Sequence, residues 1–330
     1  MGNTNTIGGV SMGISKTSIL LASIVFFSLS FVTTIVGQNV ISFNPSLPCI
    51  NEKNKELKEG NDIFPFDFTL PTTFLGTKDN VIEDNTQSLS AIFKKLSMMH
   101  HGGIADTVRI IQIGDSHVRG LIYPHMVGDL LMKTFGSLKY TSIGINGATC
   151  HSFAKSKKIE SLFTENPDLI IISFGTNESY KNHYDANLHY EQIAELVNLI
   201  RNKLPDVHLL FTTPPGSYMK YRTYKYIRIT TKHRKKRHRY RKTTNIIYKV
   251  NPNNAAAVST ICRYATEHSL PYWDLFGFVG GEGGACQNWS YAQLMCPDHV
   301  HYLPEGYRLQ GELLYQAFIK AYNEYVSKQF

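Results

Sequence analysis

Cysteine is scarce in this sequence, and the positions of the few cysteines exclude a cysteine-rich metal-binding domain. Five are present, with spacings unlike those of a metal site: Cys49, Cys150, Cys262, Cys286 and Cys296. Charged residues are also few, at 18%, whereas 42% of residues are hydrophobic. This balance is ordinary for a soluble globular protein and excludes a globally disordered chain. The 330 residues suffice for one sizeable α/β core or two modest ones.

Acidic residues are absent from one segment, Lys220–Lys242, in which 12 of 23 residues are Lys or Arg. The formal charge of +8 comes from this segment, because the remainder has 22 basic and 26 acidic residues. The protein is therefore mildly acidic and carries one basic insertion at 220–242.

An apolar run, Ile19–Val36, follows Lys16 and precedes Gly37-Gln38. The pattern predicts a secretory signal, residues 1–37, that is cleaved after Gly37. The alternative is an uncleaved anchor, although about 18 apolar residues barely span a bilayer. No lipobox-like cysteine follows the run, which argues against lipoprotein processing. We expect an exported protein, periplasmic, extracellular or attached to the envelope, that contacts a membrane only if this segment stays uncleaved.

Export would permit disulfides among the cysteines. Cys286 and Cys296 lie ten residues apart in one loop-like region and are the candidate pair. The alternative is that all five cysteines are small apolar fillers of the core.

Hydrophobic periodicity divides the rest of the chain into an N-terminal segment and an α/β domain. Residues 38–100 are predicted to be an irregular segment ending in a helix over 85–100, and residues 101–330 alternate strands with helices. The predicted strands are 108–113, 140–145, 168–174, 208–212 and 271–275. The predicted helices are one of about 18 residues ending at 135, and those over 191–204, 254–268 and 304–325. This alternation predicts a parallel sheet with helices on both faces.

A serine follows the first predicted strand at a strand-to-helix turn, Gly114-Asp115-Ser116. Its hydroxyl would be exposed at the carboxyl end of the sheet, and its N–H would be a free donor at the helix N-terminus. Both properties suit a nucleophile, whereas the alternative is that Asp115 or Ser116 only caps the helix. Gly147 and Asn177 follow the next two strands, so the Gly147 N–H and the Asn177 amide would join the Ser116 N–H in an oxyanion hole. The alternative assigns both residues to turns.

A base for this serine is found just before the last predicted helix. Asp298 and His301 are three residues apart, so the carboxylate can hold the imidazole Nδ1–H and leave Nε2 to take the serine proton. His299 would point elsewhere. A metal site formed by Asp298, His299 and His301 is a rival hypothesis, but no further cluster at ligand spacing completes it.

Four blocks in order resemble the SGNH (GDSL-like) hydrolase family: Gly114-Asp115-Ser116, Gly147, Gly175-Thr176-Asn177 and Asp298-x-x-His301. The resemblance implies a three-layer α/β/α fold with a parallel, flavodoxin-like sheet, and ester hydrolysis through an acyl-serine without metal or cofactor. It makes Ser116 the nucleophile, His301 the base and Asp298 its partner, with Ser116, Gly147 and Asn177 as the oxyanion hole. His117 stands where the family has leucine, which we expect to leave the mechanism unchanged.

Two further details narrow the resemblance. Thr213-Pro214-Pro215 and Gly306-Tyr307 are similar to segments of secreted bacterial carbohydrate and peptidoglycan O-acetylesterases. The expected reaction is therefore removal of O-acetyl or other short acyl groups from a carbohydrate such as peptidoglycan. The alternatives are a polysaccharide O-acetyltransferase, a lipase or lysophospholipase, and a catalytically silent glycan-binding module, against which the filled catalytic positions argue.

Tyrosines alternate with cations in the basic insertion, which predicts an anionic partner. That partner would be acidic polysaccharide, phosphate groups of an envelope surface or nucleic acid, and export argues against nucleic acid. The alternative is a solvated loop. The candidate anion-binding residues are Lys220, Arg222, Lys225, Arg228, Arg234, Lys235, Lys236, Arg237, Arg239 and Arg241.

Overall fold

A six-stranded sheet forms the middle layer of the fold. The computed structural model describes residues 63–66, 69–101, 107–229 and 239–329. The parallel strands of the sheet are β2 (Arg109–Gly114), β3 (Lys139–Gly144), β4 (Leu169–Ser173), β5 (His208–Thr212) and β8 (Tyr272–Trp273). A short strand that the sequence did not predict, β1 (Ile82–Glu83), pairs antiparallel with β8. The order β1-β8-β5-β4-β2-β3 contains the flavodoxin-like arrangement of parallel strands and confirms the predicted fold class.

The central strands are continuous apolar runs because both faces of the sheet are covered. In β2, Ile110 packs into the core on one face, whereas Ile111 and Ile113 pack into the core on the other. The period of two along a strand produces this division. Each face therefore needs its own layer of helices.

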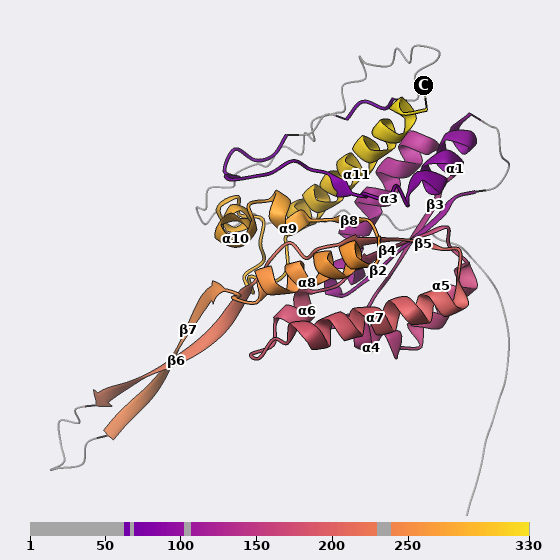
Figure 1. Ribbon diagram of the computed structural model, residues 1–330. Coiled ribbons are helices and arrows are strands. Elements are labelled where there is room, and N and C mark those ends of the chain that lie inside the picture. The colour runs from indigo at the N-terminus through magenta and orange to yellow at the C-terminus, as the bar shows by residue number, and fades with distance from the viewer. Residues whose placement is uncertain (1–62, 67–68, 102–106, 230–238, 330) are drawn as a thin grey trace, which may run out of the picture. The chain divides into compact units, whose positions relative to one another are not determined.

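Helices supply these two layers (Figure 1). One face is covered by α1 (Ser90–His100), α3 (Ile122–Phe135) and α11 (Pro304–Ser327), and the other by α4 (Cys150–Ala154), α5 (Lys158–Glu165), α7 (Ala186–Lys203) and α8 (Asn254–Glu267). At Gly311, α11 approaches α3 so closely that an added Cβ would lie 2.6 Å from the Met126 Cβ. The three-layer arrangement is the predicted one.

The helix predicted to end at residue 135 is broken in two. A short helix, α2 (Ser116–Arg119), is followed by its C-cap Gly120, and α3 begins after Leu121, whose φ is 70°. Pro124 explains the break, because in a continuous helix its ring would clash with the Gly120 carbonyl and it has no N–H to donate. The break places Pro124 in the first turn of α3, where a donor is not needed.

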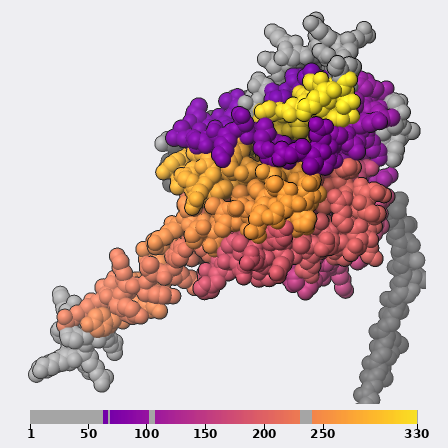
Figure 2. Space-filling model, in the orientation of Figure 1, coloured from indigo at the N-terminus to yellow at the C-terminus, as the bar shows by residue number. Residues whose placement is uncertain are grey.

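The basic insertion forms a hairpin instead of a loop. Its strands, β6 (Tyr218–Ile229) and β7 (Arg239–Val250), pair antiparallel from Tyr218 and Val250 to Ile229 and Arg239. Figure 1 and Figure 2 show the hairpin extending away from the sheet and its helices. Residues 230–238 lie outside the described chain.

The predicted disulfide between Cys286 and Cys296 is wrong, because both are free thiols, as are Cys150 and Cys262. The region is not one loop. Cys286 is buried in α10 (Gly281–Tyr291), where its thiol donates to the Ser217 carbonyl over 3.5 Å, and Cys296 lies beyond the end of that helix. The alternative of an apolar filler describes Cys286 better.

The predicted leader (1–37) and the first part of the predicted irregular segment (38–62) lie outside the described residues, as does Cys49. Residues 69–81 form no strand or helix, as expected, and α1 begins at Ser90, later than predicted. Among the helices of the described chain, none has both the length and the apolar character needed to cross a bilayer.

Candidate active site

Ser116 is the first residue of α2 and lies at the carboxyl end of β2, the strand between β3 and β4. Gly114 permits this turn, because an added Cβ would lie 2.3 Å from Val118 Cγ2 and 2.6 Å from Ser173 O. The helix is capped by Asp115, whose Oδ1 accepts the His117 N–H over 2.9 Å. The capping role therefore belongs to Asp115, and the Ser116 hydroxyl bonds elsewhere.

Its partner is His301, although 185 residues separate the two in sequence. His301 Nε2 lies 2.9 Å from Ser116 Oγ, and His301 Nδ1 lies 2.7 Å from Asp298 Oδ2. If Nδ1 carries the proton and donates it to Asp298, Nε2 is free to accept the serine proton. The structure thus brings together the three residues that the sequence predicted as nucleophile, base and orienting acid.

The short loop that carries His301 is closed by backbone bonds. Met295 and Tyr302 form an antiparallel bridge, and the Cys296 N–H donates to the His301 carbonyl over 2.8 Å. The Tyr302 hydroxyl donates to the Gly216 carbonyl over 2.8 Å. These bonds hold the imidazole at the edge of the sheet.

Asp298 is oriented by the same loop. Its Oδ1 accepts the N–H groups of Val300 and His301, each over 2.9 Å. Partial burial acts to raise the pKa of Asp298, but hydrogen bonds from the His301 ring and these two N–H groups outweigh it and lower the pKa below its ordinary value. The carboxylate is therefore ionised at neutral pH, and its charge would stabilise a protonated His301.

The three predicted oxyanion donors meet at this edge but are not equally available. Gly147 is exposed and has a φ of 72°, a left-handed conformation that favours glycine. Asn177, in α6 (Thr176–Ser179), donates its amide to Ala148 O over 2.9 Å and to Asp115 Oδ2 over 3.2 Å. The Asn177 amide is thus held beside the Gly147 turn by bonds that already occupy it.

Asp115 joins these parts, and sequence reasoning assigned it no role beyond a possible cap. Burial raises the pKa of its carboxyl to about 8, against the lowering effect of the His117 N–H bond. A pKa in this range favours the protonated carboxyl at neutral pH. It can hold Asn177 without placing a second negative charge beside a developing oxyanion.

His117 packs against His301 although the sequence gave it no role. The two ring centroids lie 5.4 Å apart, and His117 Nδ1 lies 3.0 Å from the Tyr307 hydroxyl. Burial, followed by the influence of His301, lowers the pKa of His117 to about 3. Because His117 is neutral, it does not repel the positive charge that His301 would carry after it takes a proton.

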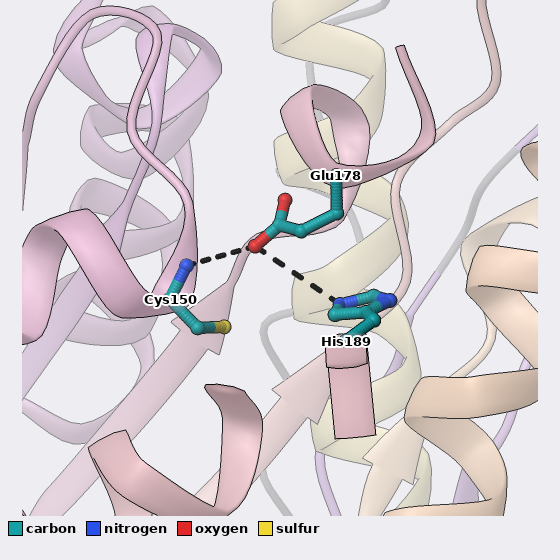
Figure 3. Close-up of side chains that lie close together, drawn as sticks. All are labelled: Cys150, Glu178 and His189. Atoms are coloured by element: carbon teal, nitrogen blue, oxygen red, sulfur yellow. Dashed lines mark hydrogen bonds and ion pairs between the residues drawn. The ribbon is translucent and has the colours of Figure 1, made fainter. Parts of the chain in front are cut away.

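A buried cluster formed by Cys150, Glu178 and His189 adjoins the oxyanion residues in sequence (Figure 3). Glu178 Oε1 accepts the Cys150 N–H over 2.8 Å, and Oε2 accepts the Gly175 N–H over 3.0 Å. Potential metal-ligand atoms of the cluster lie within 4.8 Å of one another, but both Glu178 oxygens already bind backbone. Because Glu178 directly follows Asn177 and Cys150 follows the Gly147 turn, the cluster fits a structural role that joins the two segments.

The metal hypothesis for Asp298, His299 and His301 does not match the geometry. The His299 ring lies 4.4 Å from the Tyr248 ring at the base of the hairpin, whereas His301 Nε2 faces Ser116. The His299 and His301 side chains therefore point in different directions, as expected.

The hairpin meets the site only at its base, where the Tyr218 N–H donates to the His299 carbonyl over 2.9 Å. Six of the candidate anion-binding residues lie on β6 and β7, namely Lys220, Arg222, Lys225, Arg228, Arg239 and Arg241. The other four, Arg234, Lys235, Lys236 and Arg237, lie outside the described residues.

Comparisons with known proteins show the family of the chain and resemblances in fold. The family described as GDSL-like Lipase/Acylhydrolase matches residues 110–314. A peptidoglycan O-acetylesterase structure is 15% identical with a TM-score of 0.56, over 75% of this chain and 99% of its own. A GDSL-like lipase from Bacteroides thetaiotaomicron is 21% identical with a TM-score of 0.42, over 70% of this chain and 99% of its own. No curated protein matches the chain in sequence.

Proposed function

Because the chain belongs to the GDSL-like lipase/acylhydrolase family and is a carboxylic ester hydrolase, we propose that it acts through an acyl intermediate on Ser116. The observation that carries the proposal is the continuous line of hydrogen bonds from Ser116 Oγ through His301 to Asp298. His301 Nε2 takes the hydroxyl proton as Oγ attacks the ester carbonyl. The same proton then goes to the departing alcohol, and water repeats the sequence on the acyl-serine.

The oxyanion would be stabilised by the Ser116 and Gly147 N–H groups and by Asn177. Donation by Asn177 requires that one of its two bonds exchange, and the 3.2 Å bond to Asp115 is the longer one. Each well-placed donor contributes roughly 10²–10³ in rate. A protonated Asp115 favours the exchange, because a neutral carboxyl holds an amide more weakly than a carboxylate does.

The proposed substrate is a carbohydrate carrying O-acetyl or other short acyl groups, and peptidoglycan is one candidate. Two observations support it: the Thr213-Pro214-Pro215 and Gly306-Tyr307 segments noted above, and the likeness in fold to a peptidoglycan O-acetylesterase. We further propose that the protein is exported, on the basis of the apolar run Ile19–Val36.

The test is ester hydrolysis by Ser116→Ala and His301→Ala, with Ser327→Ala at the exposed end of α11 as a control. Each of the first two changes should lower kcat on 4-nitrophenyl acetate by roughly 10³–10⁶-fold with an unchanged melting temperature. Acetate release from O-acetylated peptidoglycan and xylan, compared with hydrolysis of an octanoate ester, tests the acyl group. Near wild-type turnover by Ser116→Ala would refute the mechanism, and preference for octanoate would indicate a lipase.

A further inference from the structure

The hairpin formed by β6 and β7 carries positive charge without any acidic residue. Its pairing is regular from Tyr218 and Val250 to Ile229 and Arg239, so directly opposed residues share a face. Tyr224, Tyr226 and Tyr240 are 49%, 65% and 60% exposed. Large apolar groups gathered on an exposed surface mark an interaction site.

The two faces of the hairpin differ in composition. On one of them, which we call the tyrosine face, the register gathers Tyr218, Tyr224, Tyr226, Tyr240 and Tyr248. Lys220, Arg222, Arg228 and Lys242 lie on this face too. The opposite face has one tyrosine, Tyr221, together with Ile227 and Ile229. Aromatic rings are therefore concentrated on one side, whereas cations occur on both.

One cation of the tyrosine face lies over one of its rings. Lys242 Nζ lies 3.7 Å from the centroid of the Tyr224 ring. This cation–π contact keeps the ammonium group beside an aromatic surface that remains half exposed. A ligand on this face would meet an apolar ring and a positive charge together.

The tyrosine face ends against the loop that carries the proposed base. At the base of the hairpin the centroid of the His299 ring lies 5.4 Å from that of Tyr218 and 4.4 Å from that of Tyr248. His299 belongs to the loop in which Asp298 bonds to His301. A linear molecule lying along the tyrosine face would thus reach the loop that holds the proposed base.

The chemistry of this face fits an acidic polysaccharide. The C–H groups of a pyranose pack against aromatic rings, whose faces carry partial negative charge. Uronate or similar carboxylates would pair with Lys and Arg side chains. Nucleic acid would also suit rings and cations, but it carries no carboxylic ester for the site to cleave.

We propose that the tyrosine face is an extended subsite that binds an anionic, O-acylated polysaccharide and directs it to Ser116. The inference rests on the proposed function, because it takes the glycan as the substrate of that site. Binding should weaken with added salt, since exposed charges are screened beyond about 8 Å at physiological ionic strength.

The test compares matched variants on the two faces. One variant carries Tyr224→Ser, Tyr226→Ser and Tyr240→Ser; the control carries Tyr221→Ser, Ile227→Ser and Ile229→Ser, and neither changes the net charge. Affinity for chemically O-acetylated polygalacturonate, measured by calorimetry in the Ser116→Ala background, should fall roughly tenfold or more in the first and less than about twofold in the control. In proteins with Ser116 intact, the ratio of kcat/KM on this polymer to that on 4-nitrophenyl acetate should fall in parallel.

A second pair tests charge by position. Lys242→Gln removes the cation beside Tyr224 on the tyrosine face. Lys249→Gln removes the cation beside Tyr221 on the opposite face. The first should weaken polymer binding more than the second. Equal losses of polymer affinity from changes on the two faces would overturn the proposal. So would displacement of the glycan by poly(U) RNA, if the kcat/KM ratio of the tyrosine variant is also unchanged. Binding is measured without Ser116, so failure of the ester chemistry does not affect this comparison.

Discussion

Asp115 shows how one buried carboxyl affects both the stability of the fold and the geometry of the site. It caps α2 and accepts the Asn177 amide, yet burial raises its pKa to about 8 from an ordinary value of 3.8. Between these two values the folded protein keeps a proton that the unfolded chain releases. Unfolding free energy should therefore fall as pH rises from about 4 to 8, and this contribution should level off above 8.

The variant Asp115→Asn isolates this effect, because asparagine also caps helices but does not titrate. Urea denaturation of both proteins at pH 4, 6 and 9 should show the variant gaining stability relative to wild type with rising pH, by on the order of a few kcal/mol. A stability difference that stays constant with pH would mean that the Asp115 carboxyl is already ionised near its ordinary pKa.

Which contacts of the candidate site could be predicted depended on where the partner residues lie in the sequence. Asp298 and His301 share one loop, and their spacing alone indicated the pair. The bond from Asn177 to Asp115 and the packing of His117 on His301 join segments that are distant in sequence. No local pattern indicates such contacts, because they depend on the order of strands in the sheet.

At the scale of elements, the strands and long helices were predictable because each buries a periodic apolar face. β5 was found with its predicted limits, 208–212. The hairpin was not predicted, because both its faces are largely solvated and its tyrosines and cations show no division between core and surface. The division that does exist, between the tyrosine face and its opposite, becomes visible only through the pairing register.

Shortening this hairpin should separate substrate attraction from catalysis. Lys220 and Tyr248 are directly opposed, so replacing residues 221–247 by Asn-Gly would close them with a two-residue turn. Tyr218 and Tyr248 would remain against His299. Turnover of 4-nitrophenyl acetate should then stay within about threefold of wild type, since the bonds of the His301 loop are kept. Binding to acidic polymer should weaken and lose most of its salt dependence.

The measurements are steady-state kinetics on the small ester and polymer binding at two salt concentrations. Collapse of small-ester turnover with the fold intact would show that the outer part of the hairpin supports the active site. Polymer binding that is unchanged at low salt would show that the hairpin is a solvated element with no part in binding the polymer.

Across the whole molecule, the fold places the ends of β2, β3 and β4 at one edge and brings the loop before α11 to meet them. The four sequence blocks are thereby assembled by topology, which the alternation of strands and helices was sufficient to predict. The basic hairpin extends from a body that is otherwise mildly acidic (Figure 2), so the cluster of positive charge and the proposed catalytic residues occupy different parts of the chain.

Stability of this body rests on its two apolar cores, because the cysteines of the described chain are all free. Cys150 is buried within one core, and burial raises the pKa of Cys286 to about 12, so both thiols are poor nucleophiles in the folded state. Cys296 is only partly buried. Cys262 is also partly buried, but burial raises its pKa to about 12. Among the four described cysteines, native alkylation with iodoacetamide, followed by mass mapping without reduction, should therefore modify Cys296 first. Cys150 and Cys286 should react only at the rate of global unfolding, so their labelling should accelerate in parallel with loss of the circular dichroism signal as urea is added.

Reduction supplies the control for the free-thiol arrangement. A dithiothreitol-treated sample should melt at the same temperature as an untreated one. A drop in that temperature, or a Cys286–Cys296 peptide in the map, would contradict the free-thiol arrangement.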